Sequence, residues 1–156
     1  MKRLLTAILV LVAIPFGIFA QTGLEISQIF SGKYSSEPDV TETLMSGNQP
    51  FLRNHRLTTF ATFKGSAAKY APIIQPLILA DGAHAKGRNV RYKDGKLHYA
   101  FLILPSIKID GKKINRYVYY LNNSKGKNPS VMAIYFEGTI NDSQAANLIE
   151  TLINKH

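Results

Sequence analysis

Apolar and polar residues alternate along most of the chain, and this alternation predicts strands. The runs with a two-residue period cover 40–46, 57–64, 89–92, 97–104, 114–122 and 130–138. Asp94-Gly95 separates the third run from the fourth, and this dipeptide between two strands is a strong hairpin signal. Both sets of alternate residues in 97–104 are largely apolar, which indicates a central strand.

Three other segments repeat their apolar residues every three or four positions, which predicts helices over 24–30, 66–80 and 141–153. Pro72 and Pro76 lie inside the second segment, where an interior proline costs about 3 kcal/mol. We therefore expect that helix to start late or to kink. In the third segment Asn141 can cap the helix, and Gln144 can reach back to it as a capping box.

Helix, two strands, helix, four strands and helix thus follow one another, and this order predicts a single α+β domain. We expect an antiparallel sheet of about six strands with helices packed on one face. Strands 40–46 and 57–64 are expected to pair, with a loop over 47–53 between them. The chain has no cysteine, so the fold must depend on its hydrophobic core rather than on disulfides.

Residues 1–20 have the order of a cleavable secretory signal. Lys2 and Arg3 precede an apolar run from Leu4 to Ala20, and polar Gln21 follows. Cleavage after Ala20 would leave residues 21–156 of the 156 as the mature domain. The run is slightly short for a membrane span of about 20 residues, and the mature chain has no candidate span. We expect an exported protein, periplasmic or extracellular.

The expected mature domain is basic. Removing Lys2 and Arg3 leaves 17 Lys and Arg against 10 Asp and Glu, a net charge of +7. Nine of these cations lie between Lys86 and Arg116, where the only acids are Asp94 and Asp110. Such a segment can attract anionic polysaccharide, lipid headgroups or nucleic acid, or it can be a solvated surface.

Few residues suggest catalysis, and no cofactor is expected. Ser66 and Lys69 match the Ser-x-x-Lys pattern of acylating serine enzymes, but its companion motifs are missing, which favours a helix cap at Ser66. The histidines have no metal-site spacing, and His98 is expected to be half-buried in a strand. No glycine-rich phosphate loop occurs. Interleaved tyrosines and cations resemble a single-strand nucleic-acid platform, a reading that the export signal disfavours.

Several short segments of the chain resemble sequence motifs of a known protein family. They are Gly23-Leu24-Glu25-Ile26, 29–34, Asp81-Gly82-Ala83, 95–99, 115–120 and 134–139. Together they resemble the exported family of unknown function six-one-zero-eight of Bacteroidota. The resemblance implies a bacterial envelope location. It implies no assigned activity and carries over no functional residue.

The leading hypothesis is a non-enzymatic extracytoplasmic module that binds an anionic partner, such as an envelope glycan, or another exported protein. The residues assigned to binding are Arg88, Arg91, Lys96, Arg116, Tyr117 and Tyr119. The alternative is a small hydrolase of envelope polymers that uses Glu137 or Asp81. A cleft with two carboxylates would favour the hydrolase, and an exposed apolar sheet face without such a cleft would favour the binding module.

Overall fold

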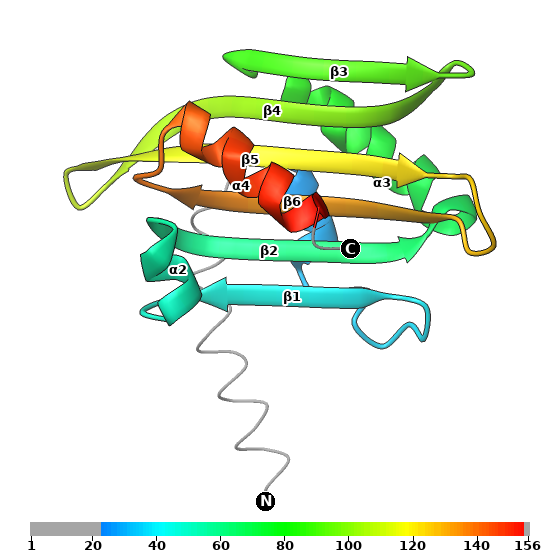
Figure 1. Cartoon of the computed structure of the whole chain (residues 1–156), viewed down its shortest axis with the longest axis horizontal. Helices are drawn as coiled ribbons and strands as arrows, with labels where there is room; N and C mark the ends of the chain where they lie inside the picture. The colour runs from blue at the N-terminus through cyan, green and yellow to red at the C-terminus, as the bar shows by residue number, and fades with distance from the viewer. Residues whose placement is uncertain (1–22, 155–156) are drawn as a thin grey trace, which may run out of the picture.

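Six antiparallel strands form one sheet in the order β1-β2-β6-β5-β4-β3 in a computed structural model that describes residues 23–154 (Figure 1). The strands are β1 (Thr41–Ser46), β2 (Leu57–Ser66), β3 (Gly87–Lys93), β4 (Lys96–Ile109), β5 (Lys112–Asn123) and β6 (Ser130–Gly138). The predicted α+β class with a six-stranded antiparallel sheet is confirmed, as is the pairing of the first two strands. The expected signal over 1–20 lies outside the described residues.

One 3₁₀-helix and three α-helices accompany the sheet. They are η1 (Glu25–Phe30), α2 (Pro50–Asn54), α3 (Ala67–Gly82) and α4 (Asp142–Asn154). α2 lies in the segment expected to be a loop; it is short, begins at Pro50 and buries Leu52. None of the helices found in residues 23–154 has the length and hydrophobicity of a membrane span.

The helices cover both faces of the sheet, which corrects the expectation of a single covered face. On one side, the α3 face, Tyr70, Ile74 and Ile78 of α3 and Ile26 of η1 pack on the sheet. On the other side, the α4 face, α4 crosses in front of β5 and β6 (Figure 1) and buries Leu148. The reason is that β5 and β6 are apolar on both sides, so one layer of helices would leave half of their side chains in water.

The helix ends follow their local sequence signals. Asn141 Oδ1 accepts from the Gln144 N–H at 2.8 Å, and Gln144 Oε1 accepts from the Asn141 N–H at 3.1 Å, so the predicted capping box is confirmed. α3 starts at Ala67 rather than late, although Pro72 and Pro76 lie within it. Both prolines are on its exposed side, so packing of the apolar side offsets the missing backbone bonds.

Two Asp-Gly turns connect the last part of the sheet. Asp94 and Gly95 have φ values of 52° and 74° between β3 and β4, which confirms the predicted hairpin. Asp110 and Gly111, with φ values of 50° and 77°, join β4 to β5 in the same way. Such left-handed turn residues match the twist of the flanking strands.

The backbone passes very close to Gly138 at the end of β6. A Cβ added there would run into the carbonyl oxygen of Arg56, which itself accepts from the Thr139 N–H at 3.0 Å. At Gly82, in contrast, an added Cβ would make an ordinary 3.6 Å contact with Leu102. Gly138 is thus required by packing between β2 and β6.

We expect Gly138→Ala to lower the free energy of unfolding by about 2 kcal/mol or more, because the new methyl group overpacks a backbone contact. The matched change Gly82→Ala should alter it by less than about 1 kcal/mol, since the site has room and alanine favours helix. Urea unfolding of both variants measures this difference. Equal effects of the two substitutions would contradict the close approach at Gly138.

Candidate ligand-binding site

The six residues that the sequence analysis assigned to binding fall into two groups in the structure. Three of them are exposed cations, namely Arg88, Arg91 and Lys96. The other three belong to the core, namely Arg116, Tyr117 and Tyr119. The exposed fractions of the buried three are 7%, 0% and 1%. Alternation cannot show which residues are buried when both faces of a strand are covered, and these six side chains do not form one surface.

The two carboxylates of the hydrolase alternative are buried and hold structure together. Asp81 accepts hydrogen bonds from the Glu25 and Ile26 N–H groups at 2.8 and 2.9 Å, which ties η1 to the end of α3. Burial raises the pKa of Asp81, and these bonds oppose the shift. Glu137 is 1% exposed and accepts from the Tyr135 hydroxyl at 2.6 Å. Neither carboxylate lines the cavity beside the first turns of α3, the cavity between α2 and α4 or the cavity near the end of α4.

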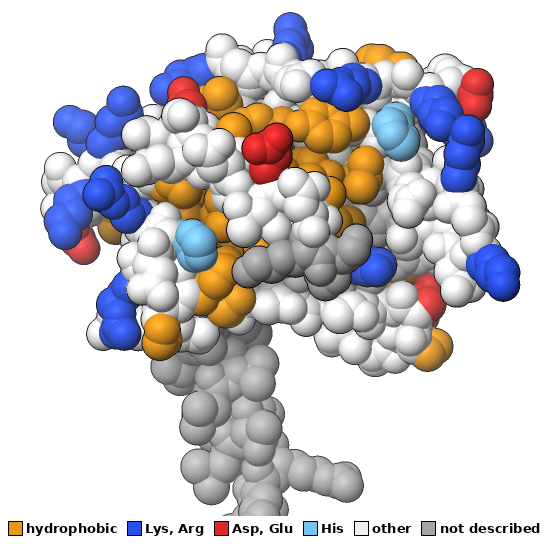
Figure 2. Space-filling model, viewed as in Figure 1, with side chains coloured by type: hydrophobic (Ala, Val, Ile, Leu, Met, Phe, Trp, Pro, Cys, Tyr) orange, Lys and Arg blue, Asp and Glu red, His pale blue; other side chains and the backbone are white. Residues whose placement is uncertain are grey.

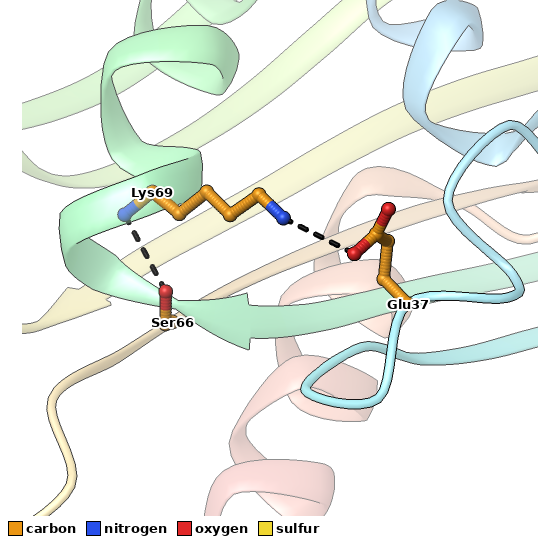
Figure 3. Close-up of polar contacts among 3 residues, drawn as sticks. All are labelled: Glu37, Ser66 and Lys69. Atoms are coloured by element: carbon orange, nitrogen blue, oxygen red, sulfur yellow. Dashed lines mark hydrogen bonds and ion pairs between the residues drawn. The ribbon is translucent and has the colours of Figure 1, made fainter.

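Ser66 and Lys69 are not arranged as a nucleophile and its base (Figure 3). The Lys69 backbone N–H donates to Ser66 Oγ at 3.4 Å, so Ser66 caps α3 as expected. The Lys69 ammonium points away from the serine and forms an ion pair with Glu37 at 3.2 Å. The hydroxyl therefore receives no help from this lysine in losing its proton.

A cavity of about 570 Å³ lies on the α3 face, at the end of the sheet where α3 begins. The first turns of α3, the β3–β4 hairpin and the β5–β6 loop all meet at this end, on the right in Figure 1. The Ala67 N–H donates to the Pro129 carbonyl at 3.1 Å, so the helix start is fixed to the β5–β6 loop. The main lining residues are Ala67, Ala71, Pro72, Gln75, Leu97, His98 and Asn122.

The inner wall of this cavity carries a small polar network. Gln75 Nε2 donates to the Leu97 carbonyl and to the Tyr120 hydroxyl oxygen, each at 3.4 Å. Burial raises the pKa of Tyr120, while hydrogen bonds from Gln75 and Asn122 act against the rise. Asn122 is 6% exposed, and its Oδ1 has no hydrogen-bond partner among the described residues. A residue that lines the cavity therefore carries a buried acceptor that lacks a donor.

The rim of the cavity is positive. Lys93 and Lys96 line it from the hairpin, and Lys125 of the β5–β6 loop approaches Lys93. The contact with the Lys125 ammonium and its like charge lower the pKa of Lys93, whereas Asp94 acts in the opposite direction. The positive end of the α3 dipole adds to the same field. Two cations thus line this rim with a single carboxylate, that of Asp94, and a third cation, Lys125, lies beside Lys93.

The match to a known family covers most of the sequence. Residues 13–149 match the family of unknown function DUF6108. The chain belongs to this family. No curated protein and no solved structure matches the chain. The family assigns no activity to any residue.

A second surface lies on the α4 face, which its helix covers only in part. Tyr99, Phe101 and Ile103 of β4 are half-buried, and Figure 2 shows hydrophobic side chains at the surface beside α4. The Arg91 guanidinium lies 5.2 Å from the centre of the Tyr99 ring. A cavity of about 550 Å³ opens near the end of α4, but no unpartnered buried side-chain atom lines it among the described residues.

The remaining chemistry of the described chain is sparse. No group of three or more metal-ligating side chains occurs within residues 23–154. His98 is half-buried at the edge of the α3-face cavity, as predicted for a sheet histidine. The sequence identified Lys96, but Lys125 and Asn122 were missed. Asn122 continues the alternation of Val118 and Tyr120, so its inward position could have been found; the approach of Lys125 to Lys93 depends on tertiary structure.

The buried tyrosines give a pH test of the core. Burial, with a smaller effect of Tyr99, raises the pKa of Tyr119 to about 12 from the usual 10.0. The pKa of Tyr119 is therefore higher in the folded protein than in the unfolded chain. The buried, un-ionised Tyr119 contributes its full stabilisation below pH 10, and this stabilisation is lost as the pH rises towards 12.

We therefore expect the free energy of unfolding of the wild type, relative to Tyr119→Phe, to fall between pH 10 and about 12, as urea titrations at each pH would show. Tyr92→Phe, at a side chain that is 60% exposed, is the matched control. A difference between wild type and Tyr119→Phe that stays constant with pH would mean that Tyr119 ionises freely in the folded protein.

Proposed function

We propose that this chain is exported and acts as a non-enzymatic module that binds a small anionic ligand in the α3-face cavity. The observation that carries the proposal is the positive rim of this cavity, which Lys93 and Lys96 line and beside which Lys125 approaches Lys93. Two ammonium groups held close together repel each other electrostatically, and an anion bound between them offsets this repulsion. The site is therefore better suited to an anion than to a neutral or cationic ligand.

The cavity has the size and construction of a small-molecule site. Its volume of about 570 Å³ lies within the usual range of about 300–1,000 Å³. Ala71, Pro72 and Leu97 provide apolar wall, and a few polar groups converge on it. The cavity is also fixed by the hydrogen bond between Ala67 and Pro129, so little ordering is needed on binding.

Binding is favoured over hydrolysis by the placement of the carboxylates and by the α4 face. Asp81 and Glu137 are held by backbone and tyrosine hydrogen bonds, and none of the cavities described above is lined by two carboxylates. The half-buried side chains of Tyr99 and Phe101 leave an apolar sheet face partly exposed. A partly exposed apolar face of this kind is typical of an interaction module.

Export is proposed from the sequence of residues 1–20, in which cations, an apolar run and a small residue before polar Gln21 follow in the order of a secretory signal. The periplasm, the cell surface and the medium are all consistent with this signal. An anionic ligand in these compartments has direct access to the exposed rim.

The proposal predicts that Lys93→Gln combined with Lys125→Gln weakens anion binding about tenfold or more, because each charge-assisted contact contributes about 1.5 kcal/mol. Isothermal titration with inorganic phosphate, hexuronates, sulfated disaccharides and neutral sugars would measure it. We expect saturable binding of at least one anion and none of the neutral sugars.

Lys112→Gln combined with Lys113→Gln is the matched control. Both residues are exposed on β5 beside the β4–β5 turn, and the double substitution changes the net charge by the same amount. The control should keep the wild-type affinity. Equal losses in both double variants would indicate non-specific attraction to a basic protein, and a well-folded protein that binds no anion would contradict the proposal.

A further inference from the structure

The unpartnered side-chain oxygen of Asn122 narrows the chemical class of the ligand beyond what the positive rim of the cavity requires. Asn122 is 6% exposed at the end of β5, and its side chain lines the α3-face cavity. Its Oδ1 is a buried acceptor without a hydrogen-bond partner among the described residues. Folded proteins rarely leave a buried polar atom unsatisfied, and such atoms point to a missing partner.

The missing partner must be a donor. A carboxylate or a fully ionised phosphate ester has only acceptor oxygens, so such an anionic group cannot itself satisfy Asn122. A hydroxyl group can donate to Oδ1, and further hydroxyls can pair with Gln75, which already bridges the Leu97 carbonyl and Tyr120. The ligand therefore combines a negative charge at the rim with hydroxyl groups at the inner wall.

The rest of the wall fits the carbon face of such a molecule. Ala67, Ala71, Pro72 and Leu97 provide apolar wall beside the polar groups. A sugar ring has the same two-sided character, with C–H groups on its faces and hydroxyls at its edge. Lys93 and Lys96 line the rim of the same cavity, with Lys125 beside Lys93, and can pair with the charged substituent of that ring.

We propose that the α3-face cavity binds one acidic sugar unit, with its anionic group between Lys93 and Lys125 and a ring hydroxyl donating to Asn122 Oδ1. This inference rests on the proposed function and adds the ligand class. The charge is a carboxylate or a phosphate, because both are recognised by the same lysines.

The test compares four probes on the purified wild-type protein by isothermal titration. D-Glucuronate has both features, cyclohexanecarboxylate lacks the hydroxyls, D-glucose lacks the charge, and glucose 6-phosphate replaces the carboxylate by a phosphate. We expect D-glucuronate or glucose 6-phosphate to bind about tenfold or more tightly than cyclohexanecarboxylate and D-glucose. The tighter of the two identifies the anionic group.

Asn122→Leu supplies the second arm. It should reduce the affinity for the acidic sugar about tenfold and leave that for cyclohexanecarboxylate unchanged. Asn147→Leu, at an exposed position of α4 on the opposite face, is the control and should change neither. The comparison of probes on the wild type stands even if Asn122→Leu fails to fold.

The outcomes separate this inference from the proposed function. If the acidic sugars and cyclohexanecarboxylate bind equally, and Lys93→Gln with Lys125→Gln weakens both, the anion site stands and the sugar inference is overturned. If none of the anionic probes binds, the sugar inference is overturned, and the wider anion panel decides the proposed function.

Discussion

The fold depends on the burial of β5 and β6 on both faces. Neighbouring residues such as Val118 and Tyr119 point to opposite sides of the sheet, and both are almost fully buried. Each face then needs its own cover, which α3 and η1 provide on one side and α4 and α2 on the other. Because α3 packs across one face, its first turn lies at the end of the sheet where the β3–β4 hairpin and the β5–β6 loop also lie. These three segments together line the cavity.

Much of the fold could be predicted from local patterns. The two-residue period gave all six strands, Asp94-Gly95 fixed one hairpin, and Asn141 with Gln144 marked the start of α4. The distribution of helices over the two faces could not be predicted, because a strand that is apolar on both sides does not indicate which helix covers which side. α2 was missed because a five-residue helix has too little periodicity to recognise.

The candidate site was less predictable than the fold. Lys96, one of the residues assigned to binding, lines the cavity, but Tyr117 and Tyr119, which were assigned with it, are in the core. Part of the basic segment lies at the edge of the sheet: Arg88 and Arg91 are on β3, an edge strand, and cations on such a strand disfavour pairing with other chains. Lys93 differs from them because a cation from a separate loop, Lys125, approaches it. That approach is a property of the tertiary structure.

The central claim is that the α3-face cavity, rather than the apolar α4 face, receives the ligand. Nuclear magnetic resonance of the ¹⁵N-labelled protein during titration with D-glucuronate and with glucose 6-phosphate tests it most directly. The account predicts saturable shifts of the Asn122 side-chain amide, the Ala68 N–H and the Lys93 N–H with at least one of the two. Shifts centred on Tyr99 and Phe101, or no saturable shift with either sugar, would contradict it.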